Sequence, residues 1–174
     1  MADSSARPIT PDGVVRASAL VDSVFVDRLL PRATVDGGDF TAYLMARLGV
    51  RNLPPDFRYG VTVDTALIRI GGRMADLPRQ AQIALAQLVL LLPPETRLEA
   101  QVQLRPAGKE AVLFHLLGAT IGGIPVPEPF LAPVLSDIGR QYPALTATGR
   151  DLYVQIPAGA AIRLVDGGVS ITGP

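Results

Sequence analysis

The segment Ala111–Pro127, AVLFHLLGATIGGIPVP, contains no aspartate, glutamate, lysine or arginine, and it decides the expected fold. Its first half alternates as a β-strand does, with successive side chains on opposite faces. One face carries Val112, Phe114 and Leu116, and the other carries Leu113, His115 and Leu117. A strand that is apolar on both faces must be covered on both, either by the protein itself or by a ligand.

The flanking residues indicate antiparallel hairpins. Arg97–Arg105 alternates apolar and polar residues, which predicts a strand with one face on the core and the other in water. Pro106–Lys109 is the expected turn between this strand and Ala111–Pro127. Asp166-Gly167 predicts a second tight hairpin further along the chain. The strands expected in this C-terminal part are Leu152–Ile156, Ala161–Val165 and Val169–Ile171.

Helices are expected between these strands and before them. Thr10-Pro11-Asp12 is a helix-start signal, and apolar positions then recur at helical spacing as far as Pro31, although Val24-Phe25-Val26 also suits a strand. Asp36-Gly37-Gly38 predicts a turn, after which Asp39 caps a helix that Gly49 ends. The expected buried stripe of this helix is Phe40, Leu44 and Leu48. Phe130–Tyr142 predicts the last helix, with Pro133 disturbing its first turn.

The middle of the chain predicts one more strand and one more helix. Tyr59–Ile70 is expected to form a single strand whose apolar face changes midway, and Gly71-Gly72 is expected to turn the chain. Asp76 and Pro78 then open a helix that Pro93-Pro94 closes. The last turns of this helix, Leu88–Leu92, are apolar nearly all round, so this end is expected to be enclosed.

Together these elements predict an α+β fold, a largely antiparallel, curved sheet of hairpins packed with two to four helices. Residues 1–9 are expected to be a disordered tail and residues 10–174 a single domain, with residues 10–31 either part of it or a separate N-terminal helix. Val-Asp-Gly-Gly occurs at 35–38 and again at 165–168, so a duplicated unit is a further alternative.

Composition excludes several classes of function. The chain of 174 residues has a formal net charge of zero, which argues against nucleic-acid binding. Cysteine is absent, so neither a disulfide nor a thiolate metal site is expected. With one histidine and no cysteine, a zinc site is not expected either. The sequence contains no convincing phosphate-binding loop, and no cofactor is predicted.

No catalytic group is expected. A nucleophilic triad needs a base beside the nucleophile, and His115 is the single histidine of the chain. Its position in the middle of a strand, between Leu113 and Leu117 on the same face, predicts a structural, hydrogen-bonded side chain. The chain is therefore expected not to be an enzyme.

Hydropathy places the protein outside the transmembrane class. Hydrophobic residues make up 48% of the chain and the mean hydropathy is +0.32. However, Ile83–Leu92 is too short to span a membrane and contains Gln87, and glycine and proline interrupt Ala111–Pro127. Residues 1–13 lack the layout of a signal peptide. A cytoplasmic protein is expected if the chain is complete, and a periplasmic or membrane-associated one if a targeting segment was removed. Peripheral contact with a membrane is compatible with both.

The order of elements over about residues 97–171 resembles the LmeA-like phospholipid-binding proteins and the related tubular lipid-binding (TULIP-like) group. The resemblance rests on the order of two hairpins and on three short segments. These segments are Gly123-Ile124-Pro125, Leu152-Tyr153-Val154-Gln155-Ile156-Pro157 and Asp166-Gly167-Gly168. The resemblance implies curved strands wrapped on helices around a groove that holds a lipid.

Two functions follow as expectations. The first is non-enzymatic binding of a phospholipid, a fatty acyl chain or another apolar ligand in a groove between sheet and helices. The groove is expected to be lined by Phe114, Leu116, Phe130, Val134 and Ile138, with Arg97 or Arg105 at an anionic head group. The alternative is a non-catalytic assembly subunit that covers its apolar face with a partner chain or with a copy of itself.

Overall fold

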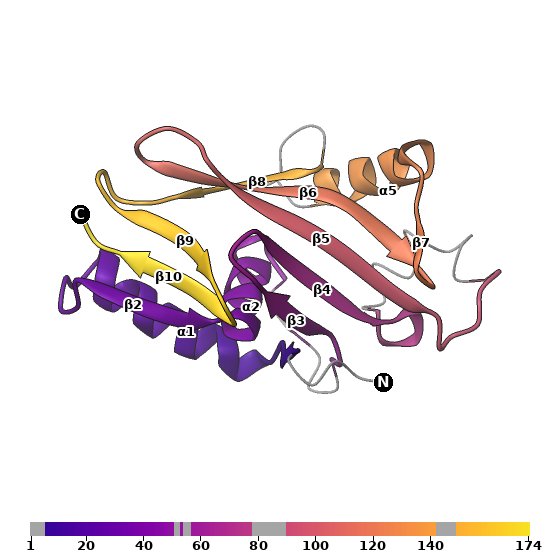
Figure 1. Ribbon diagram of the computed structural model, residues 1–174, viewed down its shortest axis with the longest axis horizontal. Coiled ribbons are helices and arrows are strands. Elements are labelled where there is room, and N and C mark those ends of the chain that lie inside the picture. The colour runs from indigo at the N-terminus through magenta and orange to yellow at the C-terminus, as the bar shows by residue number, and fades with distance from the viewer. Residues whose placement is uncertain (1–5, 51–52, 54–56, 78–89, 142–148) are drawn as a thin grey trace.

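The computed structural model describes residues 6–50, 53, 57–77, 90–141 and 149–174. In these ranges three helices pack with two antiparallel sheets, so the predicted α+β fold is confirmed (Figure 1). The helices are α1 (Pro11–Phe25), α2 (Gly37–Arg47) and α5 (Glu128–Gln141). The strands are β1 (Arg7–Pro8), β2 (Arg32–Asp36), β3 (Gly60–Val63), β4 (Leu67–Arg73), β5 (Arg97–Pro106), β6 (Ala111–Ile121), β7 (Ile124–Pro125), β8 (Asp151–Gln155), β9 (Ala161–Val165) and β10 (Gly168–Thr172).

The large sheet has seven strands and is built around the β5–β6 hairpin. Its order is β1-β3-β4-β5-β6-β7, and β8 also pairs with β6, on the residues that precede those bound by β7. β6 therefore has paired strands along both of its edges. Gly108, in the turn between β5 and β6, has a positive φ of 88°, as a tight turn requires.

One residue of β6 has no partner on β5. Val102 pairs with Leu116 and Gln101 pairs with Gly118, so Leu117 is the extra residue of a β-bulge and its side chain is exposed. A bulge bends and twists its strand. Beyond it, Ala119 and Ile121 occupy the face that Phe114 and Leu116 occupy before it, and the strict alternation read from the sequence ends here.

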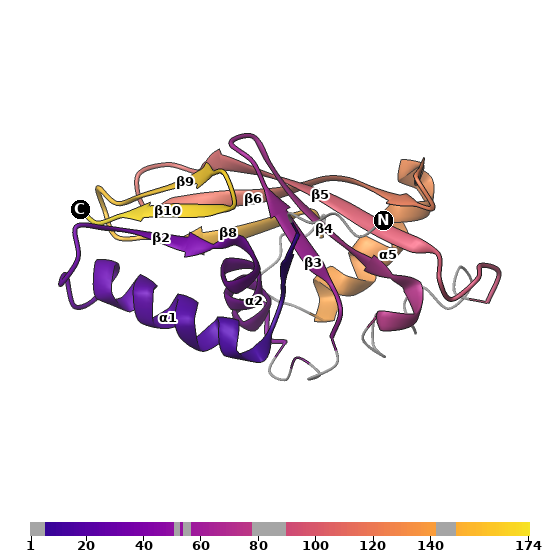
Figure 2. The same ribbon diagram turned by 60° about the horizontal axis from the view of Figure 1, so that its bottom comes forward.

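The small sheet joins the two ends of the chain. It has the order β2-β10-β9, with Val169 paired to Val35 on one side and to Leu164 on the other. Helices α1 and α2 cover one face of this sheet (Figure 2). Between sheet and helices lies the best-buried part of the core, which includes Ala17, Val35, Phe40, Val169 and Ile171.

Two segments near the N-terminus differ from the predictions. The prediction of a tail over residues 1–9 was wrong for Arg7–Ile9, because β1 pairs with β3 and Ile9 is fully buried. Gly37 and Gly38 begin α2 instead of forming a turn, because the Asp36 carboxylate accepts a hydrogen bond from the Gly38 amide and so caps the helix. Asp39 instead binds Arg16 of α1 through two hydrogen bonds of 2.6 and 2.7 Å.

The recurrence of Val-Asp-Gly-Gly is not a repeated structure. At 35–38 the four residues end β2 and begin α2, whereas at 165–168 they form the turn between β9 and β10. The two copies lie against each other, since the Gly37 amide donates to the Gly167 carbonyl at 3.0 Å. The structure therefore contradicts the duplicated unit: the same four residues adopt two conformations that meet at one junction.

The predicted single strand over Tyr59–Ile70 is two strands. The chain turns at Asp64–Ala66, and β3 and β4 pair as a hairpin. The predicted turn at Gly71-Gly72 lies inside β4, where these residues pair with Glu99 and Leu98 of β5. The predicted position of the turn was therefore wrong: the chain turns at Asp64–Ala66 and not at Gly71-Gly72.

The expected helix after Asp76 falls largely on residues 78–89, which lie outside the described residues. Asp76 itself ends a short 3-10 turn, Met74–Asp76. The expectation of an enclosed end was wrong for Leu90 and Leu91, whose side chains are largely exposed. The other predicted helices are confirmed: α1 is capped by Thr10, and α5 begins two residues before Phe130. None of the helices described by the structure is long and apolar enough to cross a membrane.

Candidate functional site

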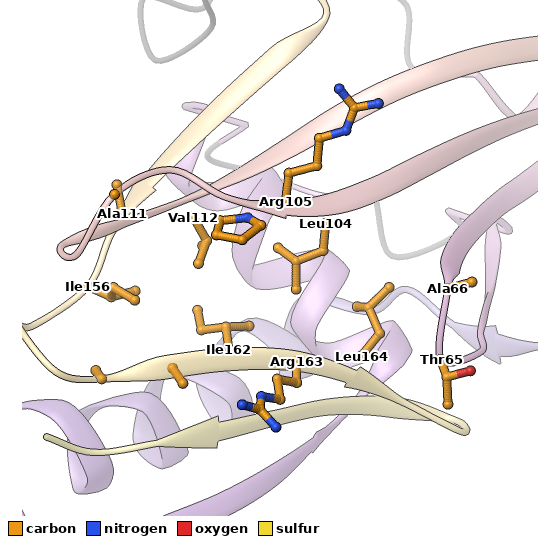
Figure 3. Close-up of a pocket in the computed structure, with 14 residues that line it drawn as sticks. Thr65, Ala66, Leu104, Arg105, Ala111, Val112, Ile156, Ile162, Arg163 and Leu164 are labelled. Carbon is orange, nitrogen blue, oxygen red and sulfur yellow. The ribbon is translucent and has the colours of Figure 1, made fainter.

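A cavity lies where the two sheets separate. Its volume is about 480 Å³, and it opens between the β5–β6 hairpin, the β3–β4 turn and strand β9 (Figure 3). In Figure 3, Leu104 and Val112 face Ile162 and Leu164 across it. The complete lining is Thr65, Ala66, Leu104, Arg105, Pro106, Gly108, Ala111, Val112, Ile156, Ala160, Ala161, Ile162, Arg163 and Leu164.

Two arginines stand on opposite rims of this cavity. Arg105 on β5 and Arg163 on β9 contribute to its lining, while their guanidinium groups are directed away from its centre (Figure 3). Arg105 donates a hydrogen bond to the Gln103 side chain at 2.9 Å, and within the described residues neither arginine has a carboxylate partner. Polar and apolar atoms contribute about equally to the cavity surface. The apolar part includes Leu104, Val112, Ile162 and Leu164, and the two guanidinium charges lie at the edge.

The Asp64 carboxylate holds the turn that forms one end of the cavity. It accepts hydrogen bonds from the amides of Ala66 and Leu67, both at 2.8 Å, and from the Arg69 guanidinium at 2.6 Å. These bonds favour the charged form, and the Ala66 amide contributes most. They lower the pKa of Asp64 to about 2. The turn carrying Thr65 and Ala66 is thus fixed by an ionised side chain.

This lowered pKa predicts a pH-dependent contribution to stability. The contribution is fully present above the ordinary pKa of 3.8 and is lost as the pH falls through about 2, because the unfolded chain takes up the proton first. The difference in free energy of unfolding between wild type and Asp64→Asn, measured by urea titration, is expected to shrink over that pH range. Arg69→Gln removes one hydrogen-bond donor to the Asp64 carboxylate. In this variant the contribution of Asp64 to stability should be lost at a higher pH. Parallel curves for wild type and Asp64→Asn would contradict this role.

The smaller cavity lies between α2 and the inner face of the large sheet. Its volume is about 160 Å³, and almost all of its wall is apolar. Leu44 and Met45 of α2, and Leu48 directly after the helix, line it together with Phe114 and Leu116 of β6. The other lining residues are Thr41, Ile68, Ile70, Val102, Gly149, Arg150 and Leu152.

The two cavities follow one another along the same strands. On β5, Leu104 lines the larger cavity and Val102 the smaller; on β6, Val112 lines the larger and Phe114 the smaller. Leu104 and Phe114 are directly paired across the two strands, and the Phe114 ring contacts Phe40 with ring centroids 5.8 Å apart. The Leu104–Phe114 pair therefore stands at the boundary between the cavities.

The residues predicted to line one groove lie in different places. Phe114 and Leu116 line the smaller cavity and Arg105 lines the larger. Arg97 lines neither of the two. Phe130 also lines neither, and 64% of its surface is exposed, whereas Leu135, also on α5, is buried. The side chains of Val134 and Ile138 lie outside the described part of the structure.

Sequence reasoning missed the contribution of β9. Ile162 and Leu164 were predicted as strand residues but not as site residues, because nothing local indicates that β9 faces the β5–β6 hairpin. The alternation of apolar residues with Arg163 was the available signal. For α2, the predicted buried stripe of Phe40, Leu44 and Leu48 is confirmed in part: Phe40 and Leu44 are buried, Leu48 is half-buried, and Leu44 and Leu48 also face the smaller cavity.

His115 is bound to a carboxylate across the sheet. Its Nδ1 lies 2.5 Å from Oδ1 of Asp151 on β8, and both side chains are mostly buried. Because His115 alternates with Phe114 and Leu116, it points to the sheet face opposite the cavities. Within the described residues no hydroxyl binds the ring, and no group of three or more potential ligands could hold a metal. The predicted hydrogen-bonded state of His115 is confirmed; its partner, Asp151, was not foreseen.

Comparison with protein families, with curated proteins and with solved structures gave no significant match.

Proposed function

We propose that the protein binds an amphipathic ligand with an apolar chain and an anionic head, such as a fatty acid or a phospholipid, and that it does so without catalysing a reaction. The observation that carries this proposal is the cavity of about 480 Å³, in which Leu104 and Val112 face Ile162 and Leu164 and at whose rims Arg105 and Arg163 lie. Small-molecule sites typically occupy roughly 300–1,000 Å³ and combine apolar walls with a few polar groups.

The rim charges favour the anionic head. Burying an acyl chain contributes about 0.8 kcal/mol per methylene, which supports affinity but does not select a head group. Arginine supplies that selection, because its planar guanidinium binds carboxylate and phosphate oxygens in pairs. The resemblance to LmeA-like and TULIP-like proteins is part of the same proposal and points to the same ligand class. The smaller cavity offers the tail further apolar surface beyond Phe114.

The test combines native mass spectrometry with a fluorescent fatty acyl probe. Wild-type protein purified gently from a lipid-containing host is expected to carry a lipid, and the delipidated protein to take up the probe. Leu164→Glu places a charge on the wall and should abolish uptake. Leu117→Glu, on the exposed bulge, is the matched control and should leave uptake unchanged. Absence of both a bound lipid and probe uptake in the wild type would refute the proposal.

The role of the arginines is tested separately. The double variant Arg105→Gln/Arg163→Gln is expected to bind a probe with a free carboxylate more weakly than the wild type does. Its binding of the neutral methyl ester of the same probe should be unchanged. Equal weakening of both probes would indicate that the arginines act on the shape of the cavity instead of on the head group.

A second candidate, an assembly subunit, is favoured by exposed apolar residues near β7. Ile124 in β7 and Phe130 in the first turn of α5 are both largely exposed, and they lie six positions apart in sequence. Exposed aromatic and aliphatic side chains close together are typical of interaction surfaces. Light scattering decides: self-association that Ile124→Ser/Phe130→Ser removes supports this candidate, and a monomeric wild type without a captured partner counts against it.

A further inference from the structure

The loop between α1 and β2 exposes three large apolar side chains. Residues Val26–Arg32 are all exposed; Val26 has 69%, Leu29 has 74% and Leu30 has 41% of its surface accessible. A single exposed apolar residue needs no explanation, but three within five residues of one loop form a patch. The loop lies at one extreme end of the molecule in both ribbon views (Figures 1 and 2).

The loop is held in one conformation by the protein backbone. The amides of Val26 and Asp27 donate to the Asp22 carbonyl, at 2.9 and 2.8 Å. The amides of Leu29 and Leu30 donate to the Ser23 carbonyl, and the Pro31 carbonyl accepts from Gly173. The apolar side chains are therefore presented by a fixed scaffold, which reduces the entropy lost on contact with a partner.

Arg28 occupies a backbone conformation that favours glycine. Its φ is +55°, and it is the one residue other than glycine with a positive φ in the described part of the chain. Such a conformation is unfavourable for a residue with a Cβ. Glycine is the usual residue at the corresponding position after a helix. Arg28 keeps this unfavourable backbone conformation although its side chain is exposed and lies between apolar side chains. This combination points to a function of its charge.

We propose that Val26–Arg32 is a membrane-contact loop. Val26, Leu29 and Leu30 enter the boundary between lipid head groups and acyl chains, and Arg28 and Arg32 bind lipid phosphates. Apolar residues flanked by arginines match this interface chemically. The two arginines and Asp27 give the loop a net positive charge, which complements an anionic bilayer. The loop lies at one end of the molecule, where it can insert into a bilayer without a clash between the rest of the protein and the lipid surface.

Vesicle co-sedimentation tests the proposal on the full chain. Wild type is expected to bind vesicles of phosphatidylcholine with phosphatidylglycerol more tightly than vesicles of phosphatidylcholine alone. Val26→Ser/Leu29→Ser should weaken binding by at least about tenfold, since each apolar side chain withdrawn from water contributes more than that factor. Val15→Ser is the matched control, because Val15 is equally exposed but lies on the body of α1, and it should bind as wild type does.

Arg28→Gly separates function from stability. Glycine relieves the backbone conformation, so the melting temperature should rise. Loss of the charge should weaken binding to phosphatidylglycerol vesicles about fivefold. A rise in melting temperature without a loss of vesicle binding would overturn the role of Arg28.

Other outcomes overturn the membrane assignment as a whole. These are failure of wild type to bind either vesicle, equal binding by Val26→Ser/Leu29→Ser, and a wild-type dimer that this double variant converts to a monomer. The last result would assign the loop to self-association. The proposal does not rest on a ligand in either cavity, so Leu164→Glu is expected to keep vesicle binding intact.

Discussion

Replacing Gly168 by alanine is expected to destabilise the protein by about 3 kcal/mol or more, which corresponds to a fall in melting temperature of about 10 °C. Gly168 begins β10 and pairs with Asp36 of β2. A Cβ added to it would lie 2.2 Å from the Val35 carbonyl oxygen, which belongs to the backbone of the neighbouring strand. Relief would therefore require the small sheet to open at the point where the chain ends meet.

Gly167, the preceding residue, is the matched control. It has a φ of +79°, but a Cβ added to it would meet no atom within 4 Å. Gly167→Ala is thus expected to lower the free energy of unfolding by about 1 kcal/mol. Gly167→Asn should lower it less, because asparagine tolerates this backbone conformation. Thermal and urea unfolding measure all three variants. Equal losses at Gly167 and Gly168 would show that backbone conformation, and not the close contact with Val35, limits the junction.

Replacing Phe114 by alanine is expected to have the second large effect, a loss of about 3–5 kcal/mol. The ring is buried, contacts Phe40, and stands opposite Leu104 at the boundary between the two cavities. Its removal should join the cavities into one longer apolar channel. If the proposed function holds, the variant should bind fluorescent acyl probes of greater chain length than the wild type binds.

Two further variants make this prediction specific. Phe114→Leu keeps most of the apolar volume and should lose markedly less stability than Phe114→Ala. Leu117→Ala, three residues away on the exposed bulge, should change stability by no more than about 0.5 kcal/mol. A loss of less than about 1 kcal/mol for Phe114→Ala would mean that the ring is not part of the packed core.

Hairpins with local signals could be predicted from the sequence. The β5–β6 hairpin follows from strict alternation and a glycine turn, and the β9–β10 hairpin follows from Asp166-Gly167. The β3–β4 turn has no glycine or proline, and it depends on hydrogen bonds to the Asp64 carboxylate. Such a turn is hard to distinguish from a continuous strand, and the two glycines inside β4 gave a stronger but misleading signal.

The cavities could not be predicted because they depend on contacts between distant segments. Phe114 and Leu116 were recognised as inward-facing from β6 alone. Ile162 and Leu164 lie opposite that hairpin because the small sheet packs beside the large one. Nothing in the sequence of β9 specifies this placement. The same limitation applies to Val-Asp-Gly-Gly, whose two copies differ in conformation because different elements follow them.

The pairing of β2 with β10 has a consequence for folding order. Val35 is synthesised well before its partner Val169, because more than a hundred residues separate the two in the chain. Until then the apolar faces of α1 and α2 lack the strand that covers them, and closing so long a loop is slow. We expect the nascent chain to remain susceptible to protease, and to need protection from aggregation, until β10 has left the ribosome.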